Sequence, residues 1–366
     1  MSDYFELPIG YVDGKPVNTN PENMSNGHIA MIGSSGGGKS VEAQRIMSSI
    51  AQKGGTVLVL SEHGSLAEDQ IFPHYKPVID KYRNDIYAYD KGIPAKLFDP
   101  LMFPDGTVET EADTIGSVTD IISQALKLGT RQREVLRLAV EEVMKNDSYK
   151  TDGFKSIGKV LGNGNGTKGT NDLYDKMRFL FSHNIFINEG ELLKENAINI
   201  VHLEKMDLTS QEVTRELLLS FIWRLGNADQ FKNKGIYLFI DECQNASAGS
   251  KGALALLISE GRRMGINLIL ATQMVLQGTT NSVQQRISQC ALMLFFKPAA
   301  NRVSTTAKMI AQANESKWMI KLRQLKKGQF IAIGDFLWGG KAVDYPLIVT
   351  ADIAEIAEYD RKYGFF

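Results

Sequence analysis

Short apolar runs and segments of helical periodicity alternate along most of the chain. The apolar runs are typical of buried strands and lie at residues 28–32, 55–60, 197–203, 235–240, 267–271 and 291–296. The segments with apolar residues at helical spacing lie at residues 41–50, 209–225, 253–263 and 283–290. Because strands and helices alternate, the pattern predicts an α/β fold with a mainly parallel sheet that is covered by helices on both faces.

Between about residues 105 and 190 the pattern is helical instead. Apolar stripes run through residues 115–126 and 135–144, and a glycine- and asparagine-rich stretch at 161–170 predicts a flexible loop. We therefore predict a helical insertion at 105–190. It would divide an α/β core into an amino-terminal part, residues 1–104, and a carboxy-terminal part, residues 191–366, which ends in an αββα segment.

The strongest chemical signal is Gly33-Ser34-Ser35-Gly36-Gly37-Gly38-Lys39-Ser40, which matches GxxxxGK[ST] in full. It follows a predicted strand and leads into a predicted helix that starts near Lys39, the context of a phosphate-binding loop. Glycines let backbone N–H groups turn inward around a β-phosphate. Lys39 would supply charge to the β- and γ-phosphates, and the Ser40 hydroxyl is placed to bind Mg²⁺. We therefore predict that residues 33–41 bind ATP with Mg²⁺.

Asp241 and Glu242 follow the apolar strand at 235–240. Such a pair is common and also fits a strand that runs into a solvated turn. In a chain with a phosphate-binding loop, it predicts the second half of an ATP site. Asp241 would hold the Mg²⁺ shell, and Glu242 would polarise the attacking water.

Two further polar positions lie near the ends of predicted elements. Gln273 follows the strand at 267–271, where it could sense the γ-phosphate or make an ordinary strand-end hydrogen bond. Arg262 and Arg263 end the helix at 253–263. One of them could reach the γ-phosphate of a neighbouring subunit, but both also fit solvated arginines that the helix dipole favours.

Composition limits the class of protein. Apolar residues make up 43% of the chain and charged residues 23%, as in globular proteins, and the net charge is −1. DNA binding would therefore need a local patch or the channel of an oligomer. Two cysteines suit a reducing cytosol, and we find neither a signal peptide nor a membrane span. We expect a cytoplasmic protein that a partner would hold if it works at a membrane.

These motifs together resemble the HerA/FtsK superfamily of ring-forming motor ATPases, which includes the ATPases of conjugative type IV secretion systems. The resemblance rests on the order of the phosphate loop, Ser61–Gly64, Phe239–Glu242, Gly261–Gly265 and Leu270–Gln273. It implies a RecA-like P-loop core, a homo-hexamer with ATP between subunits, Arg262 as the arginine acting in trans, and Gln273 as the sensor. The chain lacks the amino-terminal domain of many relatives, so we expect either a docking partner or a motor portion only.

Three functions fit these observations. The first is a hexameric motor that moves double-stranded DNA, gripped by residues 274–282 or by the loop at 162–170 with Lys168. The alternative is a secretion or conjugation ATPase that energises a membrane-bound type IV machine without gripping DNA itself. The third is a slow nucleotide-dependent switch. The sequence leaves open what is moved, in which direction, and by which recruiting partner.

Overall fold

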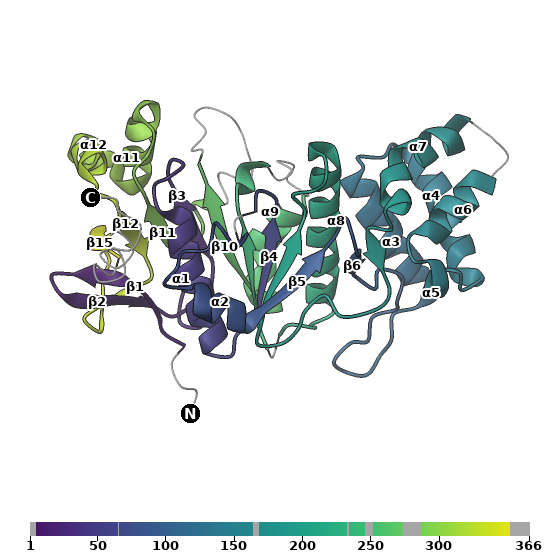
Figure 1. The fold of residues 1–366 in the computed structure, drawn as a ribbon, viewed down its shortest axis with the longest axis horizontal. Coiled ribbons are helices and arrows are strands. Elements are labelled where there is room, and N and C mark those ends of the chain that lie inside the picture. Colours follow the sequence, from purple (N-terminus) through teal and green to yellow (C-terminus); the bar gives the residue numbers. More distant parts are fainter. Residues whose placement is uncertain are drawn as a thin grey trace.

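The core of the protein is a large mixed sheet. The computed structural model describes residues 5–64, 66–163, 168–232, 234–245, 252–273 and 287–351. Seven strands of the sheet run parallel in the order β11-β3-β10-β9-β4-β8-β5 (Figure 1). They are β3 (Ile29–Ile32), β4 (Val57–Ser61), β5 (Arg83–Tyr87), β8 (Ile198–His202), β9 (Ile236–Ile240), β10 (Ile266–Thr272) and β11 (Leu292–Phe295). The mainly parallel α/β sheet expected from the sequence is confirmed.

Six antiparallel strands extend this sheet beyond β11. They are β12 (Gln329–Gly334), β15 (Leu347–Thr350), β1 (Leu7–Val12), β2 (Lys15–Thr19), β13 (Leu337–Trp338) and β14 (Lys341–Ala342). The β1–β2 hairpin turns at Asp13 and Gly14, whose φ angles are 49° and 73°. Tight hairpin turns need positive φ at both central positions, and aspartate and glycine tolerate it. Segments from the beginning and the end of the described chain thus share one sheet.

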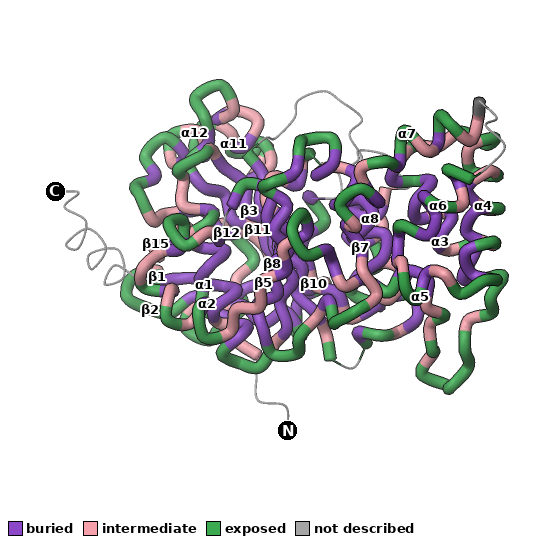
Figure 2. Tube along the Cα trace, turned by 45° about the vertical axis from the view of Figure 1, so that its right-hand side comes forward, coloured by how far each residue is buried: buried purple, intermediate pink, exposed green. Residues whose placement is uncertain are grey.

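Helices cover both faces of the parallel strands because successive strand residues point to opposite sides. Ile29 and Met31 of β3 belong to the core under α1 (Lys39–Gln52) and α2 (Lys76–Tyr82), whereas Ala30 and Ile32 belong to the core under α8 (Leu208–Asn227) and α9 (Ala253–Glu260). The central strands are accordingly buried along their length (Figure 2). For this reason, these strands appear in the sequence as continuous apolar runs and not as alternating apolar and polar residues.

Five helices gather at one end of the molecule (Figure 1). They are α3 (Glu111–Ala125), α4 (Thr130–Lys145), α5 (Tyr149–Asp152), α6 (Lys155–Asn163) and α7 (Lys168–Ser182), with a small sheet of β6 (Ile93–Pro94) and β7 (Phe186–Ile187). The loop predicted at 161–170 is shorter than expected, because α6 and α7 extend into it from both sides. Residues 164–167 lie outside the described residues. The division of the chain at 105 and 190 stays a prediction.

Some element boundaries differ from those expected. In the sequence, Thr209 and Glu212 have the residue types and spacing of a capping box, which predicts a helix start at Thr209. The structure shows that Asp207 is the cap of α8 instead, because its side chain accepts hydrogen bonds from the N–H groups of Thr209 and Ser210. The helix at 253–263 ends at Glu260 and continues as the 3₁₀ turn η2 (Gly261–Met264). The carboxy-terminal segment begins with two helices, α11 (Val303–Ala311) and α12 (Glu315–Gln324), instead of one. Half of the helix predicted at 283–290, residues 283–286, lies outside the described residues.

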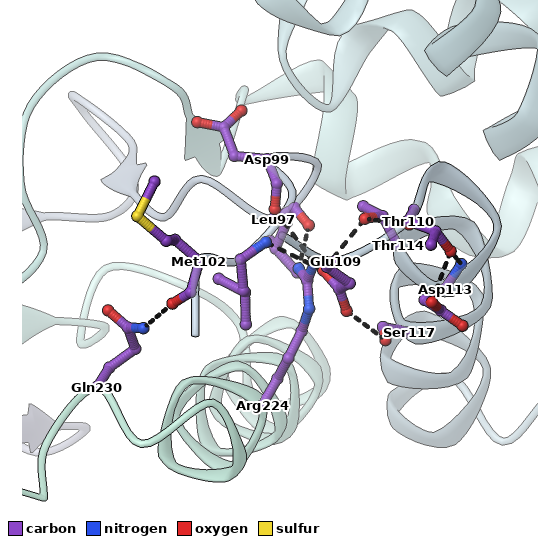
Figure 3. Close-up of polar contacts among 11 residues, drawn as sticks. Leu97, Asp99, Met102, Glu109, Thr110, Asp113, Thr114, Ser117, Arg224 and Gln230 are labelled. Carbon is purple, nitrogen blue, oxygen red and sulfur yellow. Dashed lines mark hydrogen bonds and ion pairs between the residues drawn. The ribbon is translucent and has the colours of Figure 1, made fainter. Parts of the chain in front are cut away.

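A buried arginine joins the α3–α7 helices to the core (Figure 3). Arg224 of α8 donates hydrogen bonds to the carbonyl oxygens of Leu97, at 2.6 Å, and Asp99, at 3.1 Å, and forms an ion pair with Glu109 just before α3. Glu109 also accepts a hydrogen bond from the Thr114 hydroxyl. Removing one partner of a buried ion pair typically costs about 3–5 kcal/mol. This contact therefore holds the start of the helical segment, just before α3, against α8.

His28, which precedes β3, is expected to make the stability of the fold depend on pH. Its side chain is buried, and Nδ1 accepts a hydrogen bond from the N–H of Leu268 at 3.1 Å. Burial disfavours the charged imidazole and lowers the pKa of His28 to about 4, from 6.5. The unfolded chain therefore binds this proton at a higher pH than the native one. The contribution of the neutral imidazole to the free energy of unfolding is therefore fully present above pH 6.5. It is lost as the pH falls from 6.5 through 4, and the loss amounts to about 3 kcal/mol in total.

We expect His28→Asn, which does not titrate, to flatten the decrease of unfolding free energy between pH 6.5 and 4. Asparagine retains an acceptor for the Leu268 N–H. Urea unfolding at a series of pH values measures the effect, with exposed His74→Asn as the control. Parallel curves for the parent and His28→Asn would contradict this assignment.

None of the helices in the described part of the chain is long and apolar enough to cross a membrane.

Candidate nucleotide site

The phosphate loop lies at the carboxyl end of β3, between the ends of β10 and β11. The N–H of Gly33 donates to the carbonyl oxygen of Thr272 and that of Ser34 to the carbonyl oxygen of Lys297, each at 3.1 Å. A Cβ at Gly33 would stand 2.6 Å from the Cβ of Phe296, so only glycine fits there. Gly38, with φ of 105°, turns the chain into α1. Hydrogen bonds to the end of β10 and to the segment just after β11 thus define the shape of the loop.

Lys39 is the first residue of α1, and its side chain folds back over the loop. Its Nζ donates to the carbonyl oxygens of Gly33, at 2.9 Å, and Ser34, at 3.0 Å. Burial lowers the pKa of Lys39, and the nearby carboxylates of Glu242 and Asp241 oppose that shift. The ammonium group therefore stands between the loop and two acidic side chains, where it can contact a phosphate.

The two acidic residues lie at the end of β9, the strand next to β10. Burial, assisted by the charge of Glu242, raises the pKa of Asp241. The carboxylate of Asp241 accepts a hydrogen bond from the N–H of Glu242 at 2.9 Å. Glu242 has a φ of 48°, a conformation that is uncommon for a residue with a side chain other than Asn or Asp and that recurs at functional sites. Its carboxylate accepts one hydrogen bond from Gln273 at the end of β10.

The structure brings most of the predicted site residues into one cavity of about 480 Å³. Its lining includes Ser35, Gly36, Gly38, Lys39, Ser40, Val41, Asp241, Glu242 and Gln273. Gly33, Ser34 and Gly37 complete the loop without being part of this lining. Parallel strands end at one edge of the sheet, and the ends of β3, β9 and β10 meet there. A nucleotide with its phosphates in the loop would face the two carboxylates.

Arg262 and Arg263 do not line this cavity. Arg262 lies in η2 and donates to the carbonyl oxygen of Ser25 in its own chain, whereas Arg263 contacts Asn227 and Glu260. A single chain therefore does not bring either arginine to its own phosphate loop. A role at the γ-phosphate would require a neighbouring subunit.

The donor set suits Mg²⁺. Ser40 and Asp241 offer a hydroxyl and a carboxylate to the same cavity, and Mg²⁺ prefers such oxygen ligands. In the part of the chain that is described, no group of three or more His, Cys, Asp or Glu could form a cage of its own. Mg²⁺ at nucleotide sites commonly has one or two protein ligands, with phosphates and water completing the shell. The residues present fit that kind of site.

Sequence reasoning missed several residues around the site. Arg215 of α8 is buried, and its guanidinium lies 2.7 Å from Glu62 at the end of β4 and 2.7 Å from the carbonyl oxygen of Asn245 after β9. It therefore ties two strand ends together. The sequence signal was a charged residue inside a helix that is apolar on most sides. Phe72 and Tyr75 also line the cavity, from a segment whose sequence has no periodic pattern.

Comparisons with known proteins identify the family of the chain. The sequence model of the family described as "Helicase HerA, central domain" matches residues 7–222. The chain is 23% identical to a probable helicase of Methanocaldococcus jannaschii over 98% of its own length and 68% of the relative's. It is 24% identical to the DNA double-strand break repair helicase HerA of Saccharolobus solfataricus, over 96% of its own length and 69% of the relative's.

Solved structures share the fold. VirB4 of Thermoanaerobacter pseudethanolicus superposes with a TM-score of 0.68 at 16% identity, covering 97% of this chain and 99% of that one. The bacterial conjugative coupling protein TrwB superposes with a TM-score of 0.57 at 14% identity, covering 94% of this chain and 89% of that one. The RecA-like P-loop core expected from the sequence is confirmed. The chain belongs to the HerA helicase family, within the HerA/FtsK superfamily of motor ATPases.

Proposed function

We propose that this chain hydrolyses ATP and uses the energy, as a homo-hexameric ring, to move double-stranded DNA. The observation that carries the ATPase part is the single cavity in which Lys39, Asp241, Glu242 and Gln273 meet. TrwB has been solved with non-hydrolysable ATP and GTP analogues and with ADP and Mg²⁺, which supports a nucleotide in the corresponding cavity.

The chemistry follows from the geometry. Water attacks the γ-phosphorus and passes a proton to the Glu242 carboxylate, while the bond from that phosphorus to the β–γ bridging oxygen breaks and ADP leaves. Lys39 and the loop N–H groups neutralise charge on the β- and γ-phosphates. Mg²⁺, bound through Ser40 and Asp241, would supply further charge. Gln273, bonded to Glu242, is placed to respond to loss of the γ-phosphate.

The proposal of a ring is supported by the position of Arg262, which a single chain does not bring to its own cavity. Arg262 lies outside its own cavity, and an arginine that acts in trans needs an adjacent subunit. In the hexamer that we propose, Arg262 of one subunit would stabilise charge at the γ-phosphate held by the next. A membrane-bound partner could recruit such a ring without any direct insertion of this chain.

A basic segment supports DNA as the cargo. Residues 297–327 contain eight Lys and Arg and one Glu, a net charge of +7, so the rest of the chain carries −8. The segment includes α11 and α12, which lie beside the phosphate loop (Figure 1). Its buried apolar residues, such as Ala307 and Leu322, anchor the two helices to the core. Most of the charged side chains of the segment are exposed, which supports a local basic patch of the kind that DNA binding would need.

Several of these cations are available for phosphate. Lys297, Lys317, Arg323 and Lys326 are exposed, and within the described ranges no carboxylate lies within 4.0 Å of their side-chain nitrogens. Many other cations of the chain are paired, including Arg133 with Asp120. Lys317 and Arg323 lie in α12 and Lys326 lies two residues after its end; we call these three residues the α12 cations. The grip segment predicted at 274–282 lies outside the described residues, as does the side chain of Lys168.

Neutralising the α12 cations tests this proposal. In Lys317→Gln/Arg323→Gln/Lys326→Gln, we expect affinity for a 30-base-pair duplex to fall by about 10-fold or more at low salt. The slope of log affinity against log salt should decrease by about 2–3, because each phosphate contact contributes about 0.9. Fluorescence anisotropy of labelled DNA across a salt series measures both quantities. ATPase activity without DNA should not change.

The matched control is Lys155→Gln/Lys176→Gln/Arg178→Gln, which removes three exposed cations from α6 and α7. Equal weakening in both triples would mean that net charge alone, and not this surface, decides the affinity. A parent protein that neither binds duplex DNA at low salt nor hydrolyses ATP faster in its presence would overturn the DNA motor. The type IV secretion or conjugation ATPase would then be the function to test.

A further inference from the structure

Gln244, two residues after Glu242, joins the turn after β9 to the end of β10. It lies in η1 (Cys243–Asn245). Its amide nitrogen donates to the Glu242 carboxylate, and its amide oxygen accepts a hydrogen bond from the Thr272 hydroxyl at 2.6 Å. A carboxylate can only accept, whereas a hydroxyl can donate or accept, so the amide nitrogen must face Glu242. Both polar atoms of the Gln244 amide are therefore hydrogen-bonded.

Each oxygen of the Glu242 carboxylate is held by a different glutamine. Gln244 donates to Oε2 and Gln273 donates to Oε1. The two glutamines differ in their surroundings. Gln273 is exposed, whereas Gln244 is half-buried and rests on Thr272, whose side chain is buried at the end of β10.

The turn that carries Gln244 is also fixed on its other side. Cys243 is fully buried, and Arg215 donates to the carbonyl oxygen of Asn245 at 2.7 Å. The neighbouring Glu242 backbone has a positive φ, which needs support from its surroundings. Gln244 therefore has little freedom to move relative to Glu242.

We propose that Gln244 is a positioning residue: it orients the Glu242 carboxylate for the attacking water and links that orientation to the end of β10. This inference rests on the proposed ATPase function. A free glutamate side chain has several rotamers, and a base must be within about 3 Å of the proton that it removes. Gln244 and Thr272 would select one rotamer, although neither residue lines the cavity.

Gln244→Glu is the decisive variant because it keeps the shape of the side chain and an acceptor for the Thr272 hydroxyl. It loses the donor to Glu242 and places a second carboxylate beside it. We expect kcat for ATP to fall by at least about 10-fold, with the dissociation constant for ATP within about two-fold of the parent's. Gln244→Ala should likewise lower kcat and leave the dissociation constant for ATP nearly unchanged.

A double-mutant cycle tests the link to β10. Thr272→Val removes the hydroxyl with little change in volume, and it should lower kcat in the parent. In the Gln244→Ala background, Thr272→Val should have no further effect, because the two side chains act as one unit. Gln230→Ala is the matched control. Gln230 also donates to two acceptors, the carbonyl oxygens of Met102 (Figure 3) and Ala228, but it is not part of the cavity lining. Its loss should therefore leave kcat unchanged.

The outcomes separate this inference from the proposed function. If the parent hydrolyses ATP and Glu242→Gln does not, but Gln244→Glu and Gln244→Ala both have the parent's kcat, then Gln244 has no positioning role. Multiplicative effects of Thr272→Val and Gln244→Ala would overturn the link to β10. Equal turnover by the parent and Glu242→Gln would instead overturn the assignment of Glu242 as the base, and the role of Gln244 with it.

Discussion

Lys39→Ala is expected to abolish nucleotide binding, with an affinity for ATP at least about 100-fold below the parent's. Among the residues that line the cavity, Lys39 is the one whose ammonium bonds to the phosphate loop itself, at the carbonyl oxygens of Gly33 and Ser34. Alanine removes the charge that would neutralise the β- and γ-phosphates. It also removes the two hydrogen bonds that hold the loop closed over the start of α1.

Isothermal titration with ATP and Mg²⁺ measures this loss, and circular dichroism confirms that the variant is folded. Lys53→Ala, at the exposed carboxyl end of the same helix, is the control and should bind ATP as the parent does. Binding by Lys39→Ala at the parent's affinity would show that the nucleotide does not place its phosphates in this loop.

Glu242→Gln should bind ATP normally and hydrolyse it about 10²–10³-fold more slowly than the parent. The amide has nearly the shape of the carboxylate, so the cavity is preserved. It cannot accept a proton from water, and it offers one acceptor where the carboxylate offers two to Gln244 and Gln273. The variant should therefore separate binding from chemistry.

Phosphate release measures turnover, and titration with ATP measures affinity. Glu191→Gln, at an exposed carboxylate outside the cavity lining, is the control for loss of one negative charge. Turnover by Glu242→Gln at the parent's rate would mean that another group activates the water. Loss of ATP binding in the same variant would mean that Glu242 supports the site structurally.

The two variants also define the reference states for the other experiments. Lys39→Ala represents the protein without nucleotide, and Glu242→Gln represents the protein that retains ATP. Comparing the DNA affinity of these two states tests whether the contact that we propose between the α12 cations and DNA depends on bound ATP. A motor that steps along DNA requires a difference between the two affinities, because a ligand can shift a conformation only through differential binding.

Local patterns in the sequence were enough to locate most of the residues that meet in the candidate site. The phosphate loop from Gly33 to Ser40 and the pair Asp241-Glu242 are contiguous, and each follows a run of buried strand residues. Their roles depend on where parallel strands end, which the alternation of strands and helices already predicts. Gln273 could be found for the same reason. The basic segment at 297–327 was also visible in the sequence, but the net charge of −1 conceals it.

Tertiary structure decided which residues support that chemistry, because their partners come from distant parts of the chain. Arg215 meets Glu62, which is 153 positions away, and Gln244 meets Thr272, 28 positions away. Neither pairing leaves a periodic signal, since a side chain that bridges two strand ends has no constraint on its sequence spacing. The cap of α8 shows a related limit: Asp207 and Thr209 both fit a cap by type, and the backbone N–H groups of the first turn selected Asp207. Residue type thus determined what the site can do, and packing determined how it is held.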